Sequence, residues 1–145
     1  MSALGGRFEG VRALDLFAGS GALGLELLSR GAEHVTFVER AAASLRCLGR
    51  NVESLGAGPR ATIVSNDVFR FLESRGAGAT LPALALADPP YESGLAPRLV
   101  ESFAATPFAD TLWVEHATRE PMPALGTLTS RRYGDTTLTT LARTP

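Results

Sequence analysis

Cysteine is scarce in this chain, which has 145 residues and a single thiol, Cys47. One thiol excludes an internal disulfide framework and any zinc site built on several thiolates. The chain also lacks an apolar run near the roughly 18 residues of a membrane helix. Its N-terminus lacks the charged-then-apolar pattern of an export signal. We therefore expect a cytoplasmic protein with no membrane segment and no metal.

The chain also lacks an excess of either charge, because its 14 basic and 15 acidic residues give a formal net charge of −1. Phosphate contacts supply most of the non-specific affinity for nucleic acid, so this balance is a weak basis for holding nucleic acid unaided. Apolar residues make up 45% of the chain and charged residues 20%, as in soluble globular proteins. The length suits one domain with a sizeable core. We expect a single domain over residues 1–145.

Short apolar runs alternate with helical patterns, which predicts an α/β fold with helices on both faces of a mostly parallel, seven-stranded sheet. Gly134-Asp135 predicts the turn of a C-terminal antiparallel hairpin. Residues 76–78 are expected to form a loop. The expected strands span 11–17, 34–39, 61–65, 81–88, 111–115, 127–133 and 136–143, and the expected helices span 21–30, 41–55, 67–74 and a segment carrying Leu95, Leu99, Val100 and Phe103.

A glycine motif, Gly19-Ser20-Gly21-Ala22-Leu23-Gly24, lies between the first expected strand and the first expected helix. Glycines let the backbone approach a ligand closely, and helix N-terminal amides attract negative groups. Glu39 closes the second strand about twenty residues later, where a carboxylate can accept both hydroxyls of a ribose. The alternative is a glycine turn beside an exposed glutamate.

Two nucleoside cofactors fit this loop. A dinucleotide would place its pyrophosphate on the helix N-terminus. S-adenosyl-L-methionine (AdoMet) would instead place its carboxylate near the loop, with Asp15 and Ser20 within reach of its amino-acid end. Asn66-Asp67 ends the third strand on the same sheet edge, where Asp67 is placed to accept from an adenine amino group while the Val68 amide donates to the ring. Asp67 is equally suited to be a simple helix N-cap.

Asp88-Pro89-Pro90-Tyr91 follows a buried apolar strand, at the edge where open α/β sheets bind ligands. The carboxylate accepts hydrogen bonds, the prolines stiffen the backbone, and the aromatic ring offers a flat apolar face. Together they predict a rigid, acceptor-lined slot beside a stacking platform, suited to a planar base with an exocyclic amine. The alternative is a turn in which Tyr91 covers the core.

These motifs carry a family resemblance. The resemblance is to the bacterial small-subunit ribosomal RNA guanine-N2 methyltransferases of the D type, and it covers nearly the whole chain. It implies a Rossmann-like AdoMet-dependent methyltransferase fold and transfer of a methyl group from AdoMet to N2 of one guanine in 16S ribosomal RNA, within an assembling small subunit. The matching segments, in order, are residues 14–26, Ser29-Arg30-Gly31-Ala32, Phe37-Val38-Glu39, Asp88-Pro89-Pro90-Tyr91 and Tyr133-Gly134-Asp135-Thr136.

The motifs and the resemblance together give a set of candidate site residues. Phe17 and Tyr91 are also placed to contact a sulfonium through a cation–π interaction. The expected catalytic residues are Asp88, Pro89, Pro90 and Tyr91. The expected cofactor-binding residues are Asp15, Phe17, Ala18, Gly19, Ser20, Gly21, Glu39, Arg40, Asn66, Asp67 and Val68.

The family usually has a longer segment before its first strand, with glycine and arginine residues that help to hold RNA. Here only residues 1–10 precede that strand. We expect this difference to weaken RNA affinity more than cofactor binding. Arg131-Arg132, before the terminal hairpin turn, is the remaining candidate for phosphate contact, and its alternative is a solvated strand edge.

Three other functions fit part of the pattern. An adenine-N6 methyltransferase on DNA or RNA is possible because the tetrapeptide serves either exocyclic amine, although no separate target-recognition domain is visible. A second is an AdoMet-binding module without turnover. A dinucleotide oxidoreductase ranks last, since the chain offers neither a substrate domain nor evident residues for hydride transfer.

Overall fold

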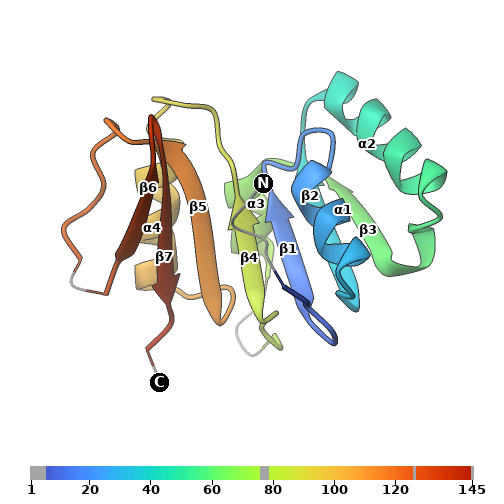
Figure 1. The fold of residues 1–145 in the computed structure, drawn as a ribbon, viewed down its shortest axis with the longest axis horizontal. Helices are drawn as coiled ribbons and strands as arrows, with labels where there is room; N and C mark the ends of the chain where they lie inside the picture. Colours follow the sequence, from blue (N-terminus) through green and yellow to red (C-terminus); the bar gives the residue numbers. More distant parts are fainter. Residues whose placement is uncertain (1–5, 76–78, 126, 145) are drawn as a thin grey trace.

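The computed structural model describes residues 6–75, 79–125 and 127–144. Its strands form one seven-stranded sheet in the order β3-β2-β1-β4-β5-β7-β6 (Figure 1). The first five strands run parallel, and β7 pairs antiparallel with both β5 and β6. The strands are β1 (Arg12–Leu16), β2 (His34–Glu39), β3 (Ala61–Ser65), β4 (Leu84–Ala87), β5 (Thr111–Ala117), β6 (Thr129–Tyr133) and β7 (Thr136–Ala142).

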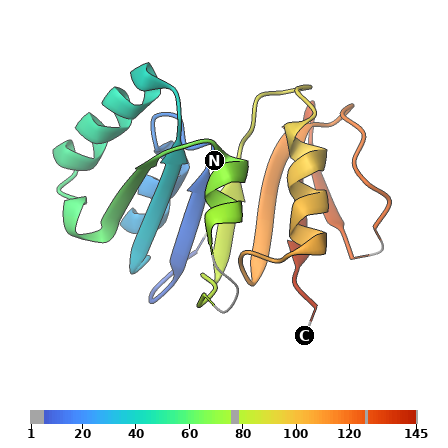
Figure 2. The same cartoon turned by 180° about the vertical axis from the view of Figure 1, so that it is seen from behind.

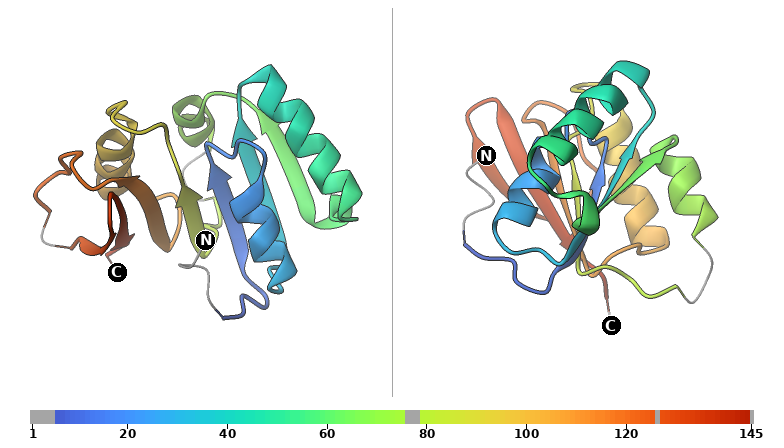
Figure 3. Two further views of the ribbon diagram at one scale, coloured as in Figure 1. Left: turned by 45° about the horizontal axis from the view of Figure 1, so that its top comes forward. Right: turned by 90° about the vertical axis from the view of Figure 1, so that its right-hand side faces the viewer.

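Helices cover both faces of the sheet, as the alternating pattern predicted. Helices α1 (Ala22–Ser29) and α2 (Ala42–Ser54) lie on the face turned to the viewer in Figure 1. Helices α3 (Val68–Ser74) and α4 (Leu95–Ala105) lie on the opposite face, which Figure 2 brings forward. The right-hand view of Figure 3 shows α1 and α4 separated by the sheet. Among the described residues, no helix is long and apolar enough to cross a membrane.

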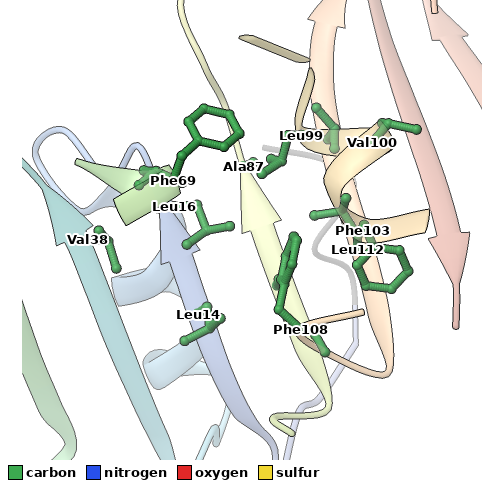
Figure 4. Close-up of a cluster of buried hydrophobic side chains, with 14 of the residues drawn as sticks. Leu14, Leu16, Val38, Phe69, Ala87, Leu99, Val100, Phe103, Phe108 and Leu112 are labelled. Carbon is green, nitrogen blue, oxygen red and sulfur yellow. The ribbon is translucent and has the colours of Figure 1, made fainter. Parts of the chain in front are cut away.

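The core has two layers because side chains alternate across the central strands. Leu14 and Leu16 of β1 pack with Phe103 and the other residues under α4 (Figure 4). Ala13, on the opposite face of the same strand, packs with the residues under α1. All four residues of β4 are buried, as expected for a central parallel strand that is covered on both faces.

Several predicted boundaries are confirmed and others shift. The bounds of β2 and β3 agree with the predicted strands. Strand β4 is shorter than the predicted 81–88, and Pro89 and Pro90 beyond its end have no N–H for a ladder. Strand β5 extends to Ala117 because β7 pairs with it up to Thr136. The loop predicted at residues 76–78 lies outside the described residues.

The parallel strands all end at one edge of the sheet, the upper edge in Figure 1. Every loop that carries a predicted site residue begins at this edge. The loops follow β1, β2, β3 and β4, and these four strands are neighbours in the sheet. The fold therefore gathers at one edge motifs that are far apart in the sequence.

Candidate functional site

A cavity of about 510 Å³ lies at the carboxyl edge of the sheet. It is walled by the four loops that follow β1, β2, β3 and β4 and by the first turns of α3 and α4. Acidic, apolar and aromatic side chains share its surface, as in many ligand sites. The lining residues are Phe17, Val38, Glu39, Arg40, Ala41, Asn66, Asp67, Val68, Phe69, Asp88, Pro90, Leu95 and Arg98.

The loop after β1 enters the cavity through an unusual backbone conformation. Phe17 has φ 58° and Gly19 has φ 57°, in the left-handed region that non-glycine residues rarely adopt. The ring of Phe17 packs edge-on against Phe69, with 6.2 Å between centroids. The Gly19 N–H donates to Glu39 Oε1 at 2.8 Å, so β1 and β2 are joined across the base of the loop.

Gly24 permits a close approach between α1 and the sheet. A Cβ there would overlap the ring of Phe37 and lie 2.9 Å from Asp15 Oδ2. The Gly24 N–H donates to that same oxygen at 3.0 Å. The motif's last glycine is therefore needed for helix–strand packing and for access of the Asp15 carboxyl group to its donor.

Asp15 is buried beneath the glycine loop, and its predicted contact with a bound ligand stays a prediction. Its side chain is only 1% exposed and supports the glycine loop from beneath. Burial raises the pKa of Asp15 to about 8, the Gly24 hydrogen bond opposes this rise, and the negative charges of Asp88 and Glu39 add to it. Asp15 is thus largely protonated near neutral pH, which avoids a buried unpaired charge.

The Glu39 carboxylate organises two loops. Oε1 accepts from Gly19 N–H, and Oε2 accepts from the amides of Arg40 at 2.9 Å and Ala41 at 2.8 Å. A carboxylate offers about four lone-pair positions, so at least one remains for a ligand. Because Glu39 also lines the cavity, its fixed orientation suits it to accept from paired hydroxyls.

The loop after β3 places a second acid on the cavity wall. Asp67 Oδ2 accepts from Arg70 N–H at 3.1 Å, which confirms Asp67 as the N-cap of α3. Its other oxygen lies 3.6 Å from Arg40 Nη1, so an ion pair bridges the loops after β2 and β3. Asn66 Oδ1 accepts from the Asp67 N–H at 2.8 Å and stiffens this turn. Contact of Asp67 with an adenine stays a prediction.

The tetrapeptide after β4 forms the opposite wall. Asp88 and Pro90 line the cavity, and Pro89, which lies between them in the sequence, is buried. Asp88 is solvent-accessible, yet desolvation by the surrounding protein raises its pKa. Tyr91 is 48% exposed, so it does not cover the core, and its hydroxyl lies 2.6 Å from Thr136 Oγ1. An acidic acceptor therefore lies on the wall opposite Glu39 and Asp67, next to an accessible aromatic ring.

The structure divides the predicted cofactor-binding residues into two groups, and of the predicted catalytic residues Asp88 and Pro90 line the cavity whereas Pro89 and Tyr91 do not. Asp15, Ala18, Gly19, Ser20 and Gly21 form or support the glycine loop without lining the cavity. Six predicted cofactor residues do line it: Phe17, Glu39, Arg40, Asn66, Asp67 and Val68.

Five lining residues were not predicted: Val38, Ala41, Phe69, Leu95 and Arg98. Ala41 and Phe69 directly follow predicted residues, so adjacency was an available signal. Leu95 and Arg98 lie one turn apart at the start of α4, immediately after the tetrapeptide loop. The Arg98 guanidinium lies over the Phe69 ring, with 3.7 Å to the centroid.

A second cavity, of about 660 Å³, lies between α3 and α4 behind Phe69 and Arg98. It contains none of the predicted site residues. We assign the site to the smaller cavity because that cavity lies at the carboxyl edge and holds the acceptor groups. Among the described residues, no group of three or more His, Cys, Asp or Glu side chains could hold a metal ion.

The strand order, the terminal hairpin and the site at the carboxyl edge define a Rossmann-like AdoMet-dependent methyltransferase fold, as predicted. An RNA methyltransferase from Salinibacter ruber, solved in complex with S-adenosyl-L-homocysteine, shares this fold with a TM-score of 0.70 and 10% sequence identity. The similarity covers 91% of this chain and 80% of that chain.

The chain belongs to the family described as Conserved hypothetical protein 95, whose model matches residues 2–142. This match and the curated relatives confirm the family predicted from the sequence. Ribosomal RNA small subunit methyltransferase D from Escherichia coli K12 is 42% identical over 84 residues, covering 58% of this chain and 40% of that protein. A protein of known structure from Thermus thermophilus has a TM-score of 0.79 and 32% identity, covering 92% of this chain and 75% of that one. This chain spans less than half the length of the curated relatives it matches.

Proposed function

We propose that this protein transfers a methyl group from AdoMet to the exocyclic N2 of a guanine in 16S ribosomal RNA. The partner is the small ribosomal subunit or its assembly intermediate, in the cytoplasm. One observation carries the proposal: Asp88 and Pro90, the corner suited to an exocyclic amine, line the same cavity as Glu39 and Asp67. The name of the Escherichia coli relative supports the choice of ribosomal RNA.

The residues of the cavity fit AdoMet. Its volume of about 510 Å³ lies within the usual range for small-molecule sites, roughly 300–1,000 Å³. Glu39 would accept from the ribose hydroxyls, Asp67 from the adenine amine, and Phe17 would contact the apolar part. When bound, AdoMet supplies an electrophilic methyl group on a sulfonium, which requires no metal.

The tetrapeptide would orient the target amine. Asp88 accepts one hydrogen bond from the amine, and the Pro89 carbonyl is the better second acceptor, since the Pro90 carbonyl already accepts from Ser93 Oγ at 2.6 Å. Two acceptors fix the amine hydrogens and direct the nitrogen lone pair towards the donor. Most of the rate enhancement then comes from positioning.

Asp88 is also placed to handle the proton that the amine loses. Desolvation raises the pKa of its carboxyl group, and a higher pKa makes the carboxylate a stronger base. The same negative charge stabilises positive charge that develops on the nitrogen. Asp88 therefore combines positioning, charge stabilisation and proton acceptance.

Tyr91 would hold the target base after it has left the RNA helix. Extruding a base costs a few kcal/mol, and stacking on an aromatic ring contributes about 1–3 kcal/mol. The half-exposed ring of Tyr91 can therefore offset much of that cost. Arg131 and Arg132 on β6 are exposed and available for phosphate contact.

Transfer of tritiated methyl groups from AdoMet tests the proposal. The substrates are small subunits that lack the modification, naked 16S ribosomal RNA and duplex DNA. We expect incorporation into the subunits or the RNA, with N2-methylguanosine as the labelled nucleoside after digestion. Label found only in N6-methyladenine would overturn the guanine assignment, and label only in DNA would also overturn the RNA assignment.

A further inference from the structure

The hairpin Tyr133-Gly134-Asp135-Thr136 carries much of the family resemblance, yet it does not line the cavity. Its last residue contacts the tetrapeptide directly. Thr136 Oγ1 lies 2.6 Å from the hydroxyl of Tyr91, a contact across 45 residues of sequence. The hairpin therefore reaches the stacking platform.

The segment after β5, residues 118–120, holds the hairpin in place. The Thr118 N–H donates to the Asp135 carbonyl at 2.7 Å, and Thr118 Oγ1 donates to the Gly134 carbonyl at 3.0 Å. Strands β5 and β7 also pair up to the contact between Ala117 and Thr136. Thr136 thus projects from a braced turn.

The same segment also holds the loop that carries Tyr91. Arg119 donates two hydrogen bonds to Glu92, at 2.7 and 2.8 Å, and Glu92 has a left-handed backbone with φ 55°. Glu120, 7% exposed, accepts from the Gly94 N–H at 3.1 Å. The tetrapeptide loop is therefore attached to the segment after β5 on the C-terminal side of Tyr91 and to the hairpin through the Tyr91 hydroxyl.

We propose that Thr136 is a positioning residue for the target base and acts by fixing the direction of the Tyr91 side chain. An exposed ring on a loop swings about its Cα–Cβ bond unless its hydroxyl is held, and the contact with Thr136 restrains this swing. A ring that is already held in place binds the base with a smaller entropy loss. The role given to Tyr91 rests on the proposed function, whereas the contact itself does not.

Kinetics test the role. Thr136→Val removes the hydroxyl, and we expect kcat/KM for RNA to fall about three- to tenfold, the range for one neutral hydrogen bond, with AdoMet affinity unchanged. Thr136→Ser should restore activity. Tyr91→Phe should match Thr136→Val, and the double variant should lose no more than either single variant. The proposal would be overturned if the loss in the double variant were the product of the two single losses, or if Thr136→Ser were as inactive as Thr136→Val.

Fluorine NMR tests the contact without methyl transfer. The chain has two tyrosines, Tyr91 and Tyr133, so 3-fluorotyrosine labelling gives two sets of lines, which Tyr91→Phe assigns. We expect Thr136→Val to change the relaxation of the Tyr91 ring, whereas Thr136→Ser and the control Thr129→Val on the same hairpin leave it unchanged. An unaltered Tyr91 ring in Thr136→Val refutes the contact. Failure of the wild type to methylate any RNA, with the NMR result intact, would instead refute the proposed function.

Discussion

Replacement of Asp88 separates the chemistry from cofactor binding. Asp88→Ala removes the charged acceptor from the corner where the amine is held. Loss of one preorganised partner of transition-state charge typically lowers kcat by about 10²–10³-fold. We therefore expect kcat to fall by about that factor, while AdoMet affinity stays near the wild-type value because Glu39 and Asp67 remain.

Asp88→Asn separates the effect of the charge on kcat from the effect of the hydrogen-bond acceptor. Asparagine keeps one oxygen acceptor and loses the charge. A hydrogen bond to a charged group contributes about 1.5–3 kcal/mol and a neutral one about 0.5–1.5 kcal/mol, so the difference corresponds to about tenfold in rate. The asparagine variant should therefore lie between the wild type and the alanine variant.

Single-turnover methyl transfer and calorimetry with AdoMet provide the measurements. Glu101→Gln, an exposed position on α4, is the matched control for loss of one carboxylate. An alanine variant that retains turnover within tenfold of the wild type would refute the assigned role of Asp88. Loss of AdoMet affinity parallel to the loss of rate would mean that Asp88 acts on the cofactor instead of the base.

Three further predictions concern stability and the loops. Gly24→Ala should destabilise the fold by about 1–3 kcal/mol, because its Cβ would overlap Phe37; thermal unfolding measures this, and an unchanged Tm contradicts it. Glu92→Arg and Arg119→Glu should each lower kcat/KM, and their combination should restore it in part by re-forming the ion pair; single variants as active as the wild type would contradict this. The pKa of Asp15 rises on folding from 3.8 to about 8, so the folded state binds a proton that the unfolded state releases between these pH values. The contribution of Asp15 to stability is therefore fully present below about pH 4 and is lost as the pH rises to about 8. Urea unfolding at pH 5 and pH 8 should show a smaller decline for Asp15→Asn than for the wild type, and equal declines would refute the burial argument.

The sequence predicted the parallel part of the sheet well because its strands were mainly apolar runs bounded by turn or polar residues, whereas the exposed and polar strand β6 was predicted from the hairpin turn beside it. The N-cap at Asp67 followed from local hydrogen bonding and is confirmed. The role of Asp15 was harder to predict, because β1 is buried on both faces and alternation could not tell which side chain faces a ligand. The hydrogen bond that Asp15 accepts from the Gly24 N–H could not be predicted from the sequence, because it depends on how α1 packs on the sheet.

Contacts between residues far apart in the sequence could not be predicted from local sequence patterns. The contact between Tyr91 and Thr136 and the ion pair between Glu92 and Arg119 join residues 45 and 27 positions apart. Leu95 and Arg98 were assigned to no site, because periodicity gives the apolar face of a helix but not which turn reaches the sheet edge. Motifs thus predicted the walls of the site, and tertiary packing determined how they are joined.

A crystal structure with bound AdoMet tests the central claim most directly. The account predicts that the ligand lies in the cavity of about 510 Å³, with its ribose at Glu39 and its methyl group facing Asp88 and Pro89. A ligand in the cavity of about 660 Å³ between α3 and α4, or one whose methyl group points away from Asp88, would contradict the account.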